Sequence, residues 1–171
     1  MGFFDRFYPR NHIKSAYDIP YDELFSKGYR GIIFDIDNTL VEHGAPADDK
    51  AIALFQKLHN LGFNTLVLSN NLEPRVKSFA LDVGTNYIHR AGKPKSKNYY
   101  KAMDIIGTET NTTIFVGDQL FTDICGANAV GMNNYLVDLI DKKEEIQIVI
   151  KRYFEKPIKY FYKRKLKRDL Q

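Results

Sequence analysis

The chain alternates between short apolar runs and longer segments whose apolar residues recur at helical spacing. Five runs predict buried strands, because short apolar stretches bounded by polar residues are typical of sheets covered on both faces. They are residues 29–34, 64–68, 87–88, 112–116 and 134–137. The segments that follow them predict helices at residues 46–61, 74–83, 96–106, 120–130 and 142–153. Strands that alternate with helices are typical of parallel βαβ units, so we expect a three-layer, Rossmann-like α/β fold with a five-stranded parallel sheet.

One domain accounts for most of this pattern. The chain has 171 residues, of which 44% are hydrophobic and 27% charged, as is usual for a soluble globular domain. Residues 1–28 are rich in aromatic side chains and contain a short helix predicted to begin after Pro20. We therefore place a single domain at residues 1–150, with this aromatic segment included.

The remaining residues, 151–171, differ in composition and form a predicted basic, aromatic tail. They contain nine Lys or Arg residues and two acids, a net charge of +7, so the preceding 150 residues have a net charge of −3 within the total of +4. No apolar stretch reaches the length needed to cross a bilayer, and the first residues lack a signal-peptide core. The single cysteine, Cys125, fits a reducing compartment. These features predict a cytoplasmic protein.

Polar side chains gather where the predicted strands end. The first predicted strand is followed by Asp35, Asp37 and Thr39, and the second by Ser69 and Asn70. The third is followed by Lys93, and the fourth by Asp118 and Asp123. Parallel strands end at one edge of the sheet, where α/β proteins bind ligands, so these groups can converge. Several carboxylates at one site call for a cation, and a divalent metal with oxygen ligands is the simplest choice. A hydroxyl and a lysine can bind phosphoryl oxygens, and two carboxylates can serve as nucleophile and general acid.

The order of these motifs resembles that of the haloacid dehalogenase-like (HAD) phosphatases. The segment from Asp35 to Thr39 is similar to their D-x-D-x-T signature, and Leu68-Ser69-Asn70 to their second motif. Lys93-Pro94 is similar to the third motif, and Gly117-Asp118 with Asp123 to the fourth. The first and fourth motifs, with the short segment before them, further resemble subclass IIIA and its YqeG family. That family is related to mitochondrial-type phosphatidylglycerophosphate phosphatases.

The resemblance implies a role for each matched residue. Asp35 would attack phosphorus and form an aspartyl-phosphate, and Asp37 would protonate the leaving oxygen and then activate the hydrolytic water. The groups implied to bind the phosphate are Thr39, Ser69, Asn70 and Lys93. The groups implied to hold Mg²⁺ are Asp35, the backbone carbonyl of Asp37, Asp118 and Asp123.

Some of these assignments have simpler alternatives. Asp123 could be an acid on a helix face, and Ser69 a turn residue at a strand end. Lys95 and Lys97 could compete with Lys93 for its role. Asn71 and Gln119 are further candidates for lining the pocket.

The spacing between the motifs bears on the substrate. Relatives with a cap domain insert it after the first motif or between the second and third. Here residues 41–68 leave room for one loop and one helix, and residues 71–92 for one helix and one short strand. We therefore expect no cap domain and an open site, suited to a phosphate displayed on a large molecule.

The basic, aromatic segment at residues 148–170 suggests where such a molecule resides. Aromatic and basic residues interleaved in this way favour the interface of an anionic membrane, here the inner face, although a solvated helix face or nucleic-acid contact remains open. We expect a Mg²⁺-dependent phosphomonoester hydrolase whose kinship points to phosphatidylglycerophosphate. The alternatives are a phosphatase of soluble sugar or nucleotide phosphates and an RNA- or ribosome-binding protein.

Overall fold

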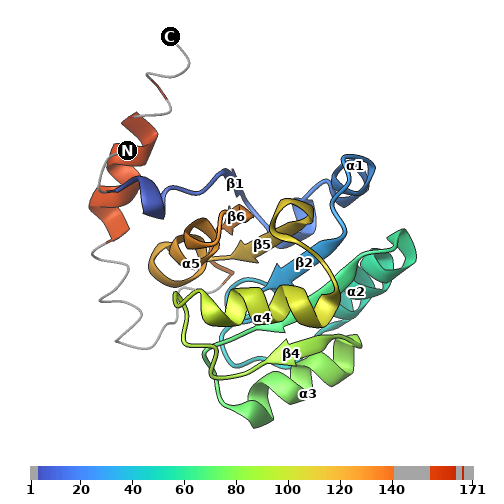
Figure 1. Ribbon diagram of the computed structural model, residues 1–171. Coiled ribbons are helices and arrows are strands. Elements are labelled where there is room, and N and C mark those ends of the chain that lie inside the picture. Colours follow the sequence, from blue (N-terminus) through green and yellow to red (C-terminus); the bar gives the residue numbers. More distant parts are fainter. Residues whose placement is uncertain (1–3, 141–154, 165–166, 168–171) are drawn as a thin grey trace.

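The computed structural model describes residues 4–140, 155–164 and 167, and they form a parallel sheet flanked by helices (Figure 1). The strand order is β1-β6-β5-β2-β3-β4, and every neighbouring pair is parallel. The strands are β1 (Asn11–Ile13), β2 (Gly31–Phe34), β3 (Asn64–Leu68), β4 (Asn86–Ile88), β5 (Thr113–Gly117) and β6 (Asn133–Val137). The predicted α/β fold is confirmed.

The predicted number of strands is wrong: the sheet formed by the described residues has six strands. The additional strand, β1, lies in the aromatic N-terminal segment and pairs with β6 at the edge of the sheet. It is only three residues long, and His12 at its centre is exposed. The side chain of Asn11 extends the pairing by donating to the Asn134 carbonyl at 3.0 Å. An edge strand held by backbone and amide hydrogen bonds needs no apolar run, so the hydrophobic pattern did not reveal it.

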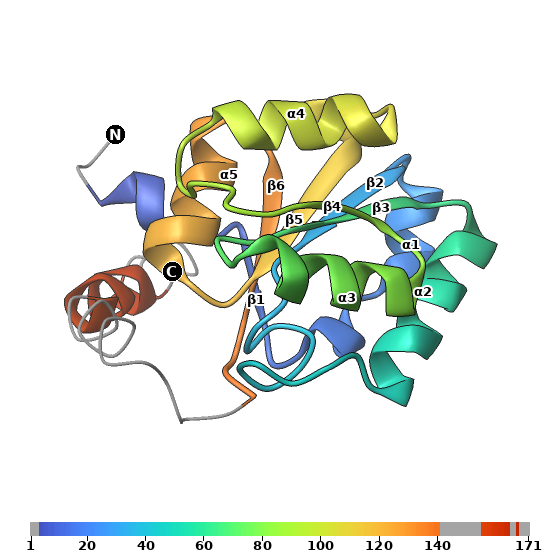
Figure 2. The same ribbon diagram turned by 90° about the horizontal axis from the view of Figure 1, so that it is seen from below.

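The helices cover both faces of the sheet, and Figure 2 shows α4 and α2 on opposite sides. They are α1 (Tyr21–Ser26), α2 (Asp49–Leu61), α3 (Glu73–Val83), α4 (Lys97–Ile106) and α5 (Cys125–Ala129). Side chains alternate along β2: Ile32 and Phe34 pack with α1, α2 and α3, whereas Ile33 packs with α4 and α5. The period-2 alternation of a strand thus builds two apolar layers from one short run.

Two of the predicted helices need comment. The predicted helix at 120–130 begins as a π-helical turn, Leu120–Ile124, and continues as the short helix α5. The predicted helix at 142–153 lies outside the described residues. Within the described ranges, no helix combines the length and apolar character that a membrane span requires.

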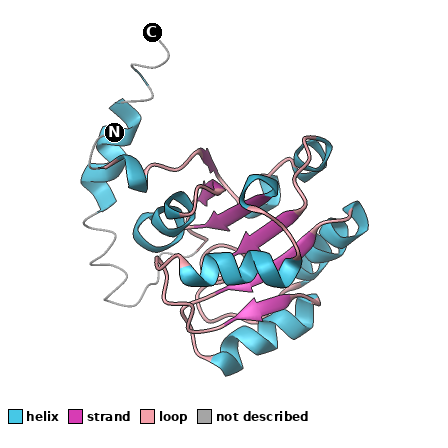
Figure 3. Cartoon of the chain, viewed as in Figure 1, coloured by secondary structure: helices cyan, strands magenta, loops and turns pink. Residues whose placement is uncertain are grey.

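Residues 155–164 form a helix that packs beside the N-terminal segment (Figure 3). Ile158 is buried in a small apolar cluster with Phe7, Leu120 and Leu136. The Glu155 carboxylate accepts a hydrogen bond from the Leu120 backbone N–H at 3.0 Å, and the Tyr162 hydroxyl donates to the Pro9 carbonyl at 3.1 Å. This part of the basic segment is therefore attached to the domain.

The connections above the carboxyl end of the sheet are short. Residues 42–48 form the loop that leads from the first motif to α2, and α3 is the only helix between β3 and β4. Neither connection contains a cap domain, so the ends of β2, β3 and β5 lie at an uncovered edge of the fold.

Candidate active site

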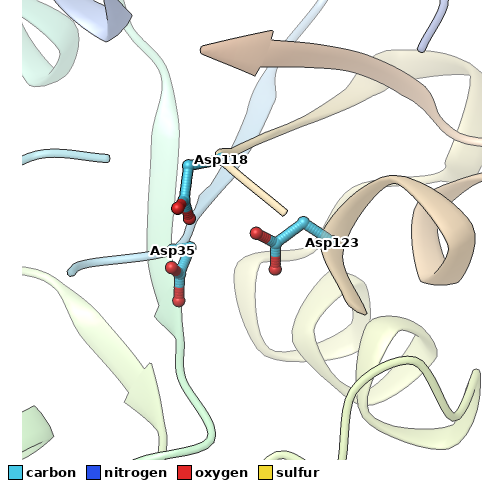
Figure 4. Close-up of side chains that lie close together, drawn as sticks. All are labelled: Asp35, Asp118 and Asp123. Carbon is cyan, nitrogen blue, oxygen red and sulfur yellow. The ribbon is translucent and has the colours of Figure 1, made fainter. Parts of the chain in front are cut away.

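Three buried carboxylates meet at the carboxyl end of the sheet (Figure 4). Asp35 follows β2, Asp118 follows β5, and Asp123 lies in the π-helical turn. One oxygen atom from each lies within 4.8 Å of the others, and the residues are only 6%, 1% and 0% exposed. The Asp35 backbone N–H donates to the Val116 carbonyl at 2.9 Å, which extends the β2–β5 pairing into the site.

Lys93 lies between two of these carboxylates. Its Nζ is 2.7 Å from Asp35 Oδ1 and 2.7 Å from Asp123 Oδ1. Burial alone would lower the pKa of Lys93, but the charges of Asp123 and Asp35 outweigh it and raise that pKa above its ordinary value. Burial raises the pKa of Asp35 to about 7 despite the opposing charge of Lys93. The lysine is thus held as an ammonium group, and burial makes Asp35 harder to ionise than an exposed carboxyl group.

The charges of this cluster do not balance. The ammonium group of Lys93 contacts two of the three carboxylates, so these four groups, when all are ionised, have two negative charges in excess. Buried charge of this kind is unfavourable unless a cation offsets it. Carboxylate oxygens from three separate segments are typical ligands of hard divalent cations. The donor set therefore fits a divalent metal at Asp35, Asp118 and Asp123.

The side chain of Asp37 has different partners, away from this cluster. Its Oδ1 accepts hydrogen bonds from the Gly44 backbone N–H at 2.8 Å and from the Arg75 guanidinium at 3.0 Å. Its Oδ2 accepts from the side-chain amide of Asn71. The Asp37 side chain is 12% exposed, so it lies nearer the solvent than the three clustered carboxylates.

The turn after Asp37 returns Thr39 toward the cluster. Asn38 adopts the left-handed conformation at φ 59°, which asparagine tolerates better than most residues, and its N–H donates to the Val41 carbonyl at 2.8 Å. Thr39 Oγ1 is then 3.4 Å from Asp118 Oδ1. Ser69 is also buried, and its Oγ accepts from the Asn71 backbone N–H at 3.2 Å.

Asn70 is placed differently from the other predicted phosphate ligands. The residue is exposed, and its Oδ1 accepts a hydrogen bond from the Lys93 backbone N–H at 2.9 Å. This bond fixes the loop that carries Lys93. In the structure Asn70 supports the lysine, whereas Thr39, Ser69 and Lys93 bring polar side-chain atoms to the buried edge.

Two residues that the sequence did not single out, Arg75 and Tyr99, shape this site, and so does Gly117 of the fourth motif. A Cβ atom at Gly117 would lie 2.5 Å from Asp123 Oδ2, so the absence of a side chain makes room for that carboxylate. The Tyr99 hydroxyl donates to the Thr122 carbonyl at 2.9 Å and lies 3.3 Å from that of Asp123. Glycine beside an acidic motif is a usable signal. An arginine or a tyrosine within a helical pattern is not, because most such residues serve packing or solvation.

The π-helical turn sets the position of Asp123. The N–H groups of Asp123 and Ile124 both donate to the Gln119 carbonyl, at 3.0 and 3.2 Å. The Gln119 N–H in return donates to Asp123 Oδ2 at 3.0 Å. Wide turns of this type are frequent at functional sites, and this one directs a carboxylate to the end of β5.

Comparison with protein families gives one family match. Residues 42–131 match the model of the haloacid dehalogenase-like hydrolases. The matched range includes Ser69, Lys93, Asp118 and Asp123 and begins just after the segment that contains Asp35 and Asp37.

Two curated proteins are similar over most of the chain. The "Probable phosphatase YqeG" of Bacillus subtilis is 32% identical over 160 residues, which cover 93% of each chain. The "Phosphatidylglycerophosphate phosphatase 1, chloroplastic/mitochondrial" of Arabidopsis thaliana is 27% identical over 158 residues, which cover 82% of this chain and 43% of that longer protein.

The fold also occurs among solved structures. A putative HAD family hydrolase from Streptomyces avermitilis superimposes with a TM-score of 0.53 at 16% identity, over 67% of this chain and 76% of that one. At this identity the likeness concerns the fold alone.

Proposed function

The chain belongs to the haloacid dehalogenase-like hydrolases and is a phosphatase of that family, and from this premise we propose that it hydrolyses phosphomonoesters with Mg²⁺ through an aspartyl-phosphate on Asp35. The observation that carries the proposal is the cluster in which Asp35, Asp118 and Asp123 lie within 4.8 Å of one another. It combines a nucleophile and a set of metal ligands on one sheet edge, with Lys93 beside them.

Asp35 performs the first step. Its carboxylate attacks phosphorus, a P–O bond forms to Asp35, and the bond between phosphorus and the leaving oxygen breaks. Asp35, Asp118 and Asp123 would hold Mg²⁺, which would supply positive charge to offset both the carboxylates and the phosphoryl oxygens. Lys93, Thr39 and Ser69 bind and orient those oxygens, because an ammonium group and two hydroxyls are suitable donors to them.

Asp37 carries the proton. It donates a proton to the leaving oxygen and then, as a carboxylate, removes one from the water that hydrolyses the aspartyl-phosphate. Its side chain lies outside the carboxylate cluster and is held by Gly44, Asn71 and Arg75, so its proton-transfer role is separated in space from nucleophilic attack.

The test is hydrolysis of an aryl phosphate with and without Mg²⁺. We expect Asp35→Asn to abolish turnover, because an amide cannot attack phosphorus, and chelation of Mg²⁺ to abolish it as well. Asp37→Asn should slow turnover by a factor on the order of 10² to 10⁴, the usual contribution of a general acid or base. Asp104→Asn, on the exposed face of α4, is the matched control and should retain full activity. Normal turnover by Asp35→Asn would contradict the proposal.

For the substrate we propose phosphatidylglycerophosphate at an anionic membrane surface. The name of the Arabidopsis relative supports this substrate, and the open sheet edge fits a phosphate group displayed on a lipid. An aromatic patch formed by Phe4, Tyr160 and Phe161, which are 38%, 58% and 45% exposed, supports the membrane surface. The rings of Phe4 and Phe161 stack at 5.9 Å, and the Arg164 guanidinium lies 5.9 Å from the Tyr160 ring. Aromatic and basic groups together are typical of residues that bind the interface of anionic bilayers.

Flotation with phosphatidylglycerol vesicles tests this part of the proposal. We expect the wild type to float with these vesicles and Tyr160→Ala/Phe161→Ala to remain in the soluble fraction. Leu81→Ala is the control, because Leu81 is 69% exposed on α3, away from the patch. Phosphatase activity confined to soluble sugar or nucleotide phosphates, without flotation, would contradict the lipid assignment. So would binding to RNA in place of vesicles.

A further inference from the structure

Arg75 on α3 is a cation at the site that the chemical steps above leave without a role of its own. Its Nη2 is 3.0 Å from Asp37 Oδ1, and the two side chains are 20% and 12% exposed. The guanidinium carbon lies 5.6 Å from the centre of the Phe79 ring, which supports one side of the group. The Nε atom is buried and donates to no group among the described residues. Arg75 is thus held in place while part of its hydrogen-bonding capacity is unused.

The position of Arg75 defines which part of a substrate it could touch. Asp37 is the proposed acid for the leaving oxygen, so a group bound to Asp37 lies on the side of the leaving alcohol. A leaving oxygen hydrogen-bonded to Asp37 Oδ1 would be roughly 6 Å or less from Arg75 Nη2, the sum of two hydrogen-bond lengths. Lys93 lies on the other side, between Asp35 and Asp123. The two cations therefore face different parts of a bound phosphate ester.

The chemistry of the guanidinium group indicates what it would bind there. It has five N–H donors in a planar fork, and its preferred partners are carboxylate and phosphate oxygens, often through two parallel hydrogen bonds. One of these N–H groups donates a hydrogen bond to Asp37. We propose that Arg75 binds an anionic group, a phosphodiester or a carboxylate, that the leaving alcohol carries within a few bonds of its oxygen. Arg75 thereby selects substrates with a second negative charge.

This inference rests on the proposed function and makes it more specific. In phosphatidylglycerophosphate, a glycerol unit separates the phosphomonoester from a phosphodiester, so the leaving alcohol has a charge of the required kind. A solely structural role for Arg75, which would be to hold Asp37, makes a different prediction. It would affect every substrate equally, whereas recognition affects only those with the second anion.

The experiment compares three soluble substrates that differ in the leaving alcohol. Glycerol 3-phosphate has a neutral one, 3-phosphoglycerate carries a carboxylate, and glycerophosphoglycerol phosphate carries a phosphodiester. We expect the wild type to prefer an anionic substrate in kcat/KM. Arg75→Met should reduce that preference by roughly 10- to 100-fold, the usual worth of a charged hydrogen bond, with most of the change in KM.

Two further variants control the comparison. Arg75→Lys keeps the charge without the fork and should retain part of the preference. Lys77→Met removes an exposed cation from the same helix and should leave the kinetics of all three substrates unchanged. The anionic substrate that loses more in Arg75→Met identifies the phosphodiester or the carboxylate as the recognised group.

Equal losses in Arg75→Met on all three substrates would overturn the inference. So would a wild type that prefers the neutral leaving alcohol. In both cases Asp35-dependent hydrolysis of an aryl phosphate would persist and the proposed function would stand. A wild type that hydrolyses no phosphate ester would overturn both.

Discussion

At the scale of single residues, the site depends on small groups that make room for charged ones. Asp123 is fully buried and accepts hydrogen bonds from Lys93 and from the Gln119 N–H. Its carboxylate occupies the room that a side chain at Gly117 would take. A shift of its carboxylate would break the hydrogen bonds to Lys93 and Gln119. Changes beside Asp123 should therefore act through it.

Gly117→Ala tests this dependence. The added Cβ would lie 2.5 to 2.7 Å from three atoms of the Asp123 side chain, so the carboxylate must move. Because displacement of a supporting group usually costs 10- to 100-fold in metal affinity or activity, we expect kcat/KM to fall by about that factor and the Mg²⁺ concentration for half-maximal activity to rise. Titration of activity with Mg²⁺ measures both.

The double variant Gly117→Ala/Asp123→Asn provides the control. If the effect acts through Asp123, the double variant should be no less active than Asp123→Asn alone. Independent, additive losses would show that Gly117 matters for another reason.

At the scale of elements, the carboxyl ends of β2, β4 and β5 bring together Asp35, Lys93 and Asp118, which are 25 to 83 positions apart in the sequence. The π-helical turn at Leu120–Ile124 then adds Asp123, and Tyr99 of α4 anchors this turn through its hydroxyl. Tyr99 of α4 thus supports the turn that carries Asp123.

Removal of this anchor should be measurable as lost stability. Tyr99→Phe leaves the buried Thr122 carbonyl without its hydroxyl donor, so we expect the free energy of unfolding to fall by about 1 to 3 kcal/mol. Urea denaturation measures the change. Tyr100→Phe alters the next residue of the same helix, which is 49% exposed, and should change stability by less than about 0.5 kcal/mol. Equal effects of the two substitutions would contradict the anchoring role.

Some features of the fold and the site could be predicted from the sequence, and others could not. The convergence of Asp35, Asp118 and Asp123 follows from the rule that parallel strands end at one edge, and the structure does place their oxygen atoms within 4.8 Å of one another. The hydrophobic pattern did not predict the edge strand β1, because its three residues pair through backbone and amide groups rather than through apolar side chains. The sequence did not identify Arg75 as a site residue, because a charged residue in a helix is ordinarily solvated. Only its distance to Asp37 distinguishes it from such a residue.

At the scale of the whole molecule, the N-terminal segment and the helix at residues 155–164 pack together at the edge of the sheet. The helix at residues 155–164 packs against the N-terminal segment and β6 through Ile158, while Glu155 accepts from the Leu120 N–H just beyond Asp118. The two ends of the described chain thus meet beside the strand that leads into the site, and the aromatic patch lies on the outer side of this junction.

Ile158→Ala tests the contribution of this junction to stability. Ile158 is 3% exposed, and truncation of a buried isoleucine leaves a cavity, so we expect a loss of about 2 kcal/mol. Ile105→Ala on α4, where the side chain is 43% exposed, should cost much less. Thermal unfolding of the two variants in parallel gives the comparison, and equal midpoints would contradict the packing of this helix on the domain.

The most direct test of the whole account is chemical identification of the nucleophile. The Asp37→Asn variant should accumulate the covalent intermediate from an aryl phosphate, since this leaving group departs without a proton whereas the hydrolytic water still needs a base. Acid quenching, reduction with borohydride and peptide mapping by mass spectrometry should then show that Asp35, and no other acid, has been converted to homoserine only when substrate was present. Reduction at another residue, or substrate turnover with an unmodified Asp35 in this variant, would contradict the aspartyl-phosphate mechanism.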